Sequence, residues 1–172
     1  MPTPKFQLSL LGRFELRGPD GPFDLTSKKL AALLAFLACT APQAHSRDKL
    51  KTLLWGSHFD AQASQNLRQA LTRLRRVLEE DALTSHGETI CLQPGVVTSD
   101  VMRFQALLGN GSREALNEAI DLYRGPLLPD ITIPEEAWTE WVDAQRRRLE
   151  GLALDAMVKL CLLYTSPSPR DS

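Results

Sequence analysis

The chain has 172 residues, 43% of them hydrophobic and 24% charged, and its formal net charge is −1. This length allows one domain, or a small domain and part of a second, and the composition is that of a soluble globular protein. No apolar run is long enough to span a membrane and the start, Met-Pro-Thr-Pro-Lys, has no hydrophobic export signal, so we expect a cytoplasmic protein that contacts no membrane.

The N-terminal residues predict a small sheet. Residues 6–16 alternate apolar and polar side chains, as in a half-buried strand, and Gly12 would form a bulge or bend within it. Residues 17–22 contain two glycines and two prolines and therefore predict a turn. Residues 23–25 would then form a short return strand.

Two helices are predicted next. The first runs from Lys28 to about Thr40 and is capped by Thr26 or Ser27. The second begins after Ser46 and is closed by Gly56. Leucines recur on one face of each helix, so both are expected to pack against the same core.

The stretch from Ala61 to Glu80 is the most informative part of the chain. Its apolar residues recur at helical spacing and would form one buried stripe, made of Leu67, Ala70, Leu71, Leu74, Val77 and Leu78. The opposite face carries arginines, glutamines and a threonine, with no acidic residue before Glu79. An ordinary solvated helix mixes charges of both signs, because opposite charges four residues apart stabilise it. We therefore interpret this helix as one that enters the major groove of DNA.

The side chains on this face have the chemistry that base and phosphate recognition needs. Arginine presents forked donors to phosphates and guanine edges, and glutamine amides pair with adenine. The candidate DNA-binding residues are Gln65, Arg68, Gln69, Thr72, Arg73, Arg75 and Arg76. We expect Arg73 and Arg75, on the flanks of the face, to contact phosphates and the others to lie nearest the bases. The alternative interpretation is an ordinary solvated surface.

Two β-prone runs follow the basic helix. Residues 89–93 and 96–100 are separated by Pro94-Gly95, which predicts a hairpin with its tip at that turn. A basic helix followed by a hairpin is the element order of winged-helix domains, in which the hairpin is the wing. This wing is poor in Lys and Arg, which argues against a minor-groove contact.

Three further helices are predicted after residue 100. Residues 101–108 and 112–123 have amphipathic helical patterns. Pro134 stands at the start of the third helix, so we interpret Glu135 and Glu136 as residues of its first turn rather than as an acid–base pair.

The third helix carries two tryptophans and an arginine run. Trp138 and Trp141 are expected to pack in the core. Residues 146–148, three consecutive arginines, are interpreted as a solvated or partner-facing surface and are not assigned to DNA.

Four blocks of the first hundred residues resemble the winged-helix domain of the Streptomyces antibiotic regulatory protein family, itself similar to the OmpR/PhoB DNA-binding domain. The blocks are LSLLGRF (8–14), KKLAALLA (28–35), SRDKL with Leu54-Trp55 (46–55) and NLRQALTRLR (66–75). The sequence LYRGPLLP (122–129), with the tryptophan-rich helix after it, is similar to the bacterial transcriptional activation domain of the same family.

The resemblance implies an α+β winged helix-turn-helix followed by an all-α tetratricopeptide-like helical domain that is truncated. Residues 1–100 would be the DNA-binding domain and residues 101–160 the start of the activation domain. The implied function is a transcriptional regulator whose partner is double-stranded DNA. RNA polymerase, or self-association through the helical domain, is a further candidate partner.

Two rival functions remain open. Similar N-terminal modules precede ATPase, cyclase or repeat domains, so the chain is alternatively the regulatory module of a larger multi-domain signalling protein. The third hypothesis is a protein-interaction module whose basic face meets an acidic partner.

No pattern of residues indicates an enzyme. The sequence has no GxxxxGK[ST] loop, GxSxG elbow, HExxH or CxxC pattern. His45, His58 and His86 lack a matching ligand spacing, so we expect them on loop surfaces. The cysteines are three in number and widely spaced, which favours neither disulfides nor zinc. We expect no catalytic residue, no metal and no cofactor.

The last twelve residues differ in character from the rest. Residues 161–172, CLLYTSPSPRDS, resemble a translated sequencing adapter, so we interpret them as an artefact. The helical pattern is expected to stop at residue 160, and the natural protein is expected to be longer.

Overall fold

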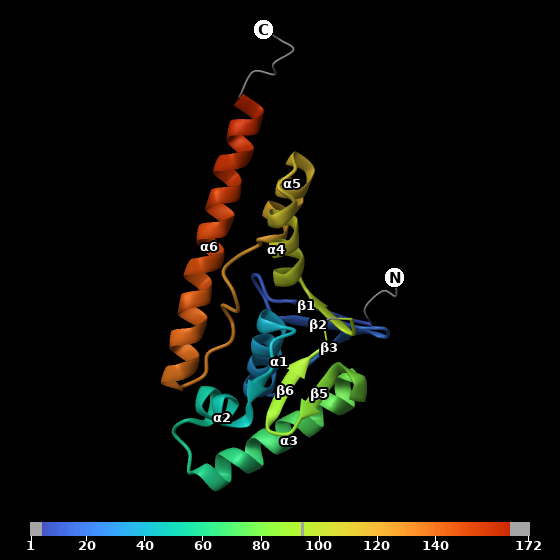
Figure 1. The fold of residues 1–172 in the computed structure, drawn as a ribbon, viewed down its shortest axis with the longest axis vertical. Helices are drawn as coiled ribbons and strands as arrows, with labels where there is room; N and C mark the ends of the chain where they lie inside the picture. Colours follow the sequence, from blue (N-terminus) through green and yellow to red (C-terminus); the bar gives the residue numbers. More distant parts are fainter. Residues whose placement is uncertain (1–4, 94, 166–172) are drawn as a thin grey trace.

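The structure, a computed structural model, describes residues 5–93 and 95–165. An α+β region lies at one end of the molecule, and a long helix runs from it along the longest axis (Figure 1). The elements of the α+β region are β1 (Phe6–Ser9), β2 (Glu15–Gly18), β3 (Gly21–Phe23), α1 (Lys28–Thr40), β4 (His45–Ser46), α2 (Arg47–Trp55), α3 (Asp60–Leu78), the 3₁₀ turn η1 (Glu80–Ala82), β5 (Leu83–His86), β6 (Thr89–Leu92) and β7 (Val97–Ser99).

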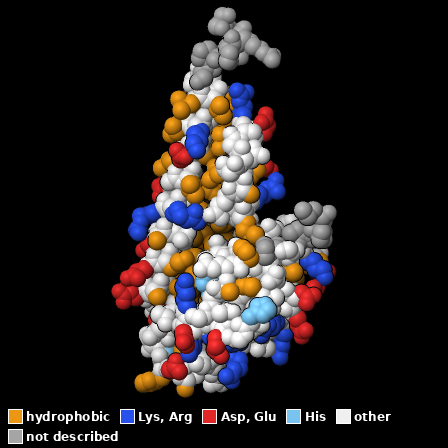
Figure 2. Space-filling view, viewed as in Figure 1, with side chains coloured by type: hydrophobic (Ala, Val, Ile, Leu, Met, Phe, Trp, Pro, Cys, Tyr) orange, Lys and Arg blue, Asp and Glu red, His pale blue; other side chains and the backbone are white. Residues whose placement is uncertain are grey.

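The helical region contains three helices. They are α4 (Asp100–Asn110), α5 (Arg113–Leu122) and α6 (Glu136–Thr165). Figure 1 shows α6 beside α5 in the upper half of the molecule, and Figure 2 shows hydrophobic side chains gathered along the seam between these helices. The predicted fold class, a winged helix followed by an all-α region, is therefore confirmed.

Short-range signals correctly located the helices. Ser27 caps α1 by accepting a hydrogen bond from Leu30 N (3.3 Å), and Ser46 caps α2 by accepting one from Lys49 N (3.1 Å). The observed bounds of both helices agree with the prediction. These caps depend on residues within the same helical turn, which is why the sequence alone locates them.

The N-terminal strand differs from its prediction. Residues 6–16 form two antiparallel strands, β1 and β2, in which Leu8 lies opposite Leu16. The chain reverses at Gly12, whose φ of 92° is in the region that favours glycine. The expected bend is therefore a full turn, and the four-stranded sheet has the order β3-β2-β1-β7.

The predicted hairpin at Pro94-Gly95 is wrong. The hairpin consists of β5 and β6, and its turn is at Gly87-Glu88, where Gly87 has a φ of 62°. Residues 97–99 instead form β7, which runs parallel to β1. Pro94 lies outside the described residues. The error arose because a parallel pairing across ninety residues leaves no local signal, whereas Pro-Gly does.

A buried cluster of apolar side chains extends through both regions. Phe36 of α1 packs edge-on against Trp141 of α6, with ring centroids 4.9 Å apart, and Trp138 is 1% exposed. The prediction that the tryptophans pack in the core is confirmed for Trp138, whereas Trp141 is partly buried and packs against the edge of the core. The α+β region and α6 are thus joined by aromatic packing, which removes a large apolar area from water.

The two regions also share backbone hydrogen bonds. Gly12 N donates to Pro126 O (2.9 Å), and Leu128 N donates to Leu10 O (2.9 Å). A Cβ atom on Gly125 would lie 3.3 Å from Gly12 Cα, so the two glycines let these two segments of the backbone approach closely. We name this contact between residues 10–12 and 125–128 the backbone seam. The resemblance blocks LLGRF and YRGPLLP, far apart in sequence, meet here.

Two charged side chains complete the backbone seam. The Asp100 carboxylate accepts hydrogen bonds from Leu10 N (2.9 Å) and Leu11 N (3.0 Å). Burial raises the pKa of this carboxyl, and the two backbone donors oppose that rise. Arg146 donates to the carbonyls of Leu127 (2.7 Å) and Leu128 (2.6 Å). The expectation that residues 146–148 form a solvated face is therefore wrong for Arg146.

Helix α6 continues further than predicted. It extends through Thr165, so the expectation that helical structure stops at residue 160 is wrong. Residues 166–172, the remainder of the adapter-like segment, lie outside the described residues. Within residues 5–93 and 95–165, no helix combines the length and apolarity that crossing a membrane requires.

His45 is buried, contrary to its expected place on a loop surface. Its side chain lies between Phe36, at a ring-centroid distance of 4.6 Å, and Thr40, whose Oγ1 is 2.7 Å from Nε2. Burial lowers the pKa of His45 from its ordinary value of 6.5, and the nearby Lys49 ammonium lowers it further. A strand of two residues, such as β4, is too short to show an alternating pattern of apolar and polar residues. The sequence therefore gives no sign that His45 is buried.

We expect Gly12→Ala to lower the free energy of unfolding by about 1–3 kcal/mol, since an alanine is strained at positive φ. A Cβ there would meet Arg124 Cβ at 3.6 Å, an ordinary contact, so strain rather than a clash would be the cause. Urea denaturation followed by circular dichroism measures the change. Gly151→Ala, in α6 with open space around it, is the control and should stabilise by about 0.5–1 kcal/mol. Equal effects of the two substitutions would contradict the strain argument.

We expect the stability of the protein to fall as the pH decreases below about 6.5. In that range the unfolded state takes up a proton at His45, while the folded state resists it, so protonation favours unfolding. The free energy of unfolding, measured by urea denaturation between about pH 7 and 5.5, should therefore decrease. His45→Gln should flatten this dependence, and His86→Gln, at an exposed position, should leave it unchanged. An unaltered slope in His45→Gln would refute the assignment.

Candidate nucleic-acid interface

Helix α3 separates an apolar face from a polar one. The buried residues are Ala63, Leu67, Ala70, Leu71, Leu74 and Leu78. They agree with the predicted stripe, except that Val77 is only partly buried and Ala63 extends the stripe by one turn. The burial of one face fixes the rotation of α3 about its axis and therefore determines which side chains point away from the protein.

The structure brings the predicted residues together on the outward face. The exposed residues are Gln65, Arg68, Gln69, Thr72, Arg73 and Arg76. Arg75 is half-buried. Their contacts with bases and phosphates remain predictions. We call these seven residues the basic face.

The arginines of the basic face are not neutralised by the protein. Among residues 5–93 and 95–165, no carboxylate lies within ion-pairing distance of their guanidinium groups. Thr72 Oγ1 donates to the carbonyl of Arg68 (2.9 Å), so its hydroxyl proton is already used while its oxygen is free to accept. The guanidinium groups of the basic face are therefore available as cationic donors to a ligand.

Two hollows border the basic face and contain positively charged residues that the sequence argument missed. One, of about 160 Å³, is lined by Lys29, Trp55, Asn66, Gln69 and Arg73, among others. The other, of about 490 Å³, contains Arg47 and Lys51 beside Arg68. Lys29 and Arg47 come from helices other than α3, which is why the periodicity of α3 gave no sign of them.

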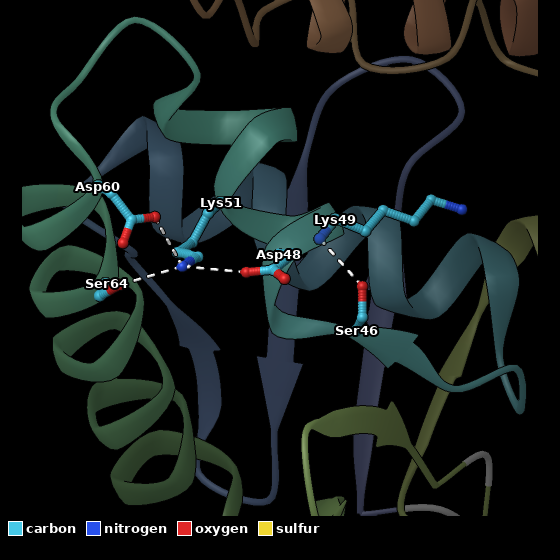
Figure 3. A network of polar contacts seen from close by, with 6 residues as sticks. All are labelled: Ser46, Asp48, Lys49, Lys51, Asp60 and Ser64. Atoms are coloured by element: carbon cyan, nitrogen blue, oxygen red, sulfur yellow. Dashed lines mark hydrogen bonds and ion pairs between the residues drawn. The ribbon is translucent and has the colours of Figure 1, made fainter.

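The first turn of α3 is held by a cluster of polar side chains (Figure 3). Lys51 of α2 donates to Asp60 (3.0 Å) and Ser64 (3.1 Å) of α3, and its ammonium lies 3.1 Å from Asp48. The hydrogen bond with Asp60, and secondarily that with Asp48, raises the pKa of Lys51. Acidic side chains are therefore concentrated at the start of α3, and the arginines lie further along it.

The wing contributes little positive charge. The turn between β5 and β6 contains Gly87 and the exposed Glu88, and residues 83–93 include no Lys or Arg. Figure 2 shows basic and acidic side chains intermixed at the lower end of the molecule, where α2 and α3 lie. The positive charge thus belongs to the basic face and its borders rather than to the whole region.

A buried carboxylate links the loop before α3 to the helical region. Glu135, which immediately precedes α6, accepts hydrogen bonds from Ser57 N (2.9 Å) and Ser57 Oγ (2.7 Å). The expectation for Glu135 was a first-turn residue of the helix. The structure places it one residue before α6, and its carboxylate contacts the α2–α3 loop. No local pattern reveals a partner 78 residues away.

Comparison with known families bears on the same part of the chain. Residues 20–96 match the family model described as "Transcriptional regulatory protein, C terminal". That segment contains α1, α2, α3 and the hairpin, the elements that build the basic face. The match supports a winged helix similar to those of the OmpR/PhoB type and a DNA-binding transcriptional regulator. The curated proteins yield no match.

A solved structure shares the fold of both regions. It is Mycobacterium tuberculosis EmbR in complex with a low affinity phosphopeptide, to which the chain is similar with a TM-score of 0.75 and 21% sequence identity. The similarity covers 89% of this chain and 44% of EmbR, so the chain spans less than half of that protein's length. At this identity the comparison shows a common fold.

Proposed function

We propose that the chain is a transcriptional regulator that places α3 in the major groove of duplex DNA. The observation that supports this most directly is the set of guanidinium groups on the basic face without carboxylate partners among the described residues. An α-helix fits the major groove, where base edges present distinct donor and acceptor patterns. The family match of residues 20–96 supports the same assignment.

Some residues of the basic face would contact DNA bases and others the DNA phosphates. Gln65, Arg68, Gln69, Thr72 and Arg76 lie centrally on the face and would meet base edges. Arg73 and Arg75, on the flanks, would meet phosphates, which set the register of the protein on DNA. Lys29 and Arg47 would add phosphate contacts on either side. Glu88 at the turn of the wing would keep that turn away from the minor groove.

The helical region would act after DNA is bound. By its resemblance to the bacterial transcriptional activation domain of the Streptomyces antibiotic regulatory protein family, it would be the start of a tetratricopeptide-like domain. Such a stack offers surfaces to RNA polymerase or to a second copy of the chain. This role would need no catalytic residue or cofactor, and the protein would act in the cytoplasm, where the DNA is.

We expect the full chain to bind random-sequence duplex DNA with an affinity that falls steeply with salt. Each phosphate contact should add about −0.9 to the slope of log affinity against log salt concentration, since each releases counterions. Arg68→Ala and Arg76→Ala should each weaken binding, by about 1–3 kcal/mol where the lost contact is a bidentate base contact. Fluorescence anisotropy across a salt series measures both quantities.

Arg147→Ala is the matched control, because this exposed arginine of α6 carries the same charge and lies outside the basic face. It should leave the affinity nearly unchanged. No binding at low salt would contradict the proposal and would favour a basic face that meets an acidic protein. Equal losses in all three variants would indicate a general charge effect rather than groove recognition.

A further inference from the structure

We propose that Glu135 is a positioning residue through which the helical region holds α3 in the orientation that binds DNA. The inference rests on the proposed function and assigns a role to a residue outside the winged helix. It starts from the geometry of the α2–α3 loop, residues 56–59, which is the segment directly before α3.

The Glu135 carboxylate is buried, and backbone and hydroxyl donors of the α2–α3 loop satisfy it. The residue is 6% exposed, and its two oxygens each accept one hydrogen bond from Ser57. His58 Nδ1 lies 3.6 Å from Oε2. In the described part of the chain no Lys or Arg pairs with this carboxylate. A buried carboxylate is stable only where such donors compensate its lost hydration, so Glu135 and the loop depend on each other.

Helix α3 lacks a side-chain cap that would fix its start independently. Its N-cap residue is Phe59, which makes no capping hydrogen bond and whose side chain is 90% exposed. The first-turn N–H groups therefore receive no side-chain acceptor from the cap position. The start of α3 is held instead from outside, by Lys51 of α2 (Figure 3) and by Glu135 acting on the loop.

The two anchors come from different parts of the molecule. Lys51 belongs to the winged helix and contacts Asp60 and Ser64. Glu135 belongs to the segment that leads into α6, a helix held on the core by Trp138 and by the contact of Trp141 with Phe36. The hydrogen bonds of the Glu135 carboxylate thus link the position of α6 to that of the loop.

This arrangement affects affinity through the fraction of molecules in which α3 is correctly placed. A protein binds with its intrinsic affinity only when the binding conformation is populated, and the apparent affinity falls in proportion to that fraction. Glu135 raises the fraction by fixing the loop before DNA arrives. The helical region therefore contributes to DNA binding without touching DNA.

The test compares four variants of the full chain. Glu135→Ala removes both acceptors, Glu135→Gln keeps one carbonyl acceptor, and Ser57→Ala removes only the hydroxyl donor. Glu136→Ala is the matched control, because this exposed neighbour carries the same charge and, among the described residues, makes no side-chain hydrogen bond or ion pair with the loop. Hydrogen exchange of amides 57–64 and binding to random-sequence duplex DNA are measured well below the melting temperature, which is recorded for each variant.

We expect Glu135→Ala to speed exchange at amides 57–64 and to weaken DNA binding about three- to tenfold, the fold-change that corresponds to the net contribution of a typical hydrogen bond. Glu135→Gln and Ser57→Ala should show smaller changes in the same direction, and Glu136→Ala should show none. Since Ser57→Ala removes one hydrogen bond, it still tests the inference where Glu135→Ala fails to fold.

Two results would overturn the inference. The first is unchanged exchange at amides 57–64 in Glu135→Ala and Ser57→Ala. The second is a lower melting temperature with DNA affinity equal to that of Glu136→Ala, because Glu135 would then be purely structural. A failure of the proposed function is recognised separately, since the unsubstituted chain itself would then not bind DNA, and the inference would fall with it.

Discussion

The backbone seam between residues 10–12 and 125–128 is the contact on which the arrangement of the whole molecule depends. It requires two glycines, one at positive φ and one where a Cβ would crowd the opposite backbone. It brings Leu127 and Leu128, both fully buried, against the sheet of the winged helix. Asp100 and Arg146 then occupy the polar groups that this approach would leave unpaired. The two regions consequently pack as layers around one core.

This packing determines what the surface can do. Because α6 lies against α1 and α2, its N-terminal end reaches the α2–α3 loop, and a carboxylate there contacts Ser57. Because α3 buries its leucines against the same core, its arginines point away from that core and form no ion pair with a described residue. Electrostatic recognition of a polyanion needs such unpaired cations. Their orientation is determined by the apolar packing of the opposite face of α3.

The parts of the fold that follow from local chemistry were predictable. Ser27 and Ser46 start α1 and α2, and the apolar stripe of α3 identified its buried side and its outward face. Interactions between distant residues were not predictable. The parallel pairing of β7 with β1, the pairing of His45 with Ile90, the contact of Arg146 with backbone carbonyls and the hydrogen bonds of Glu135 with Ser57 all join segments that are apart in the sequence. For each of these segments the local sequence indicated a turn, a loop or a charged surface. Contacts with distant parts of the chain determined a different position in the structure.

The shared core has a consequence for inheritance as well as for stability. Val101 and Phe104 of α4 are fully buried, so a genetic exchange that divided the chain at residue 100 would leave apolar surface on both products. Near the point where the family match ends, the winged helix is therefore covered by the helical region rather than by solvent. An exchange that moved both regions together would keep this shared core intact.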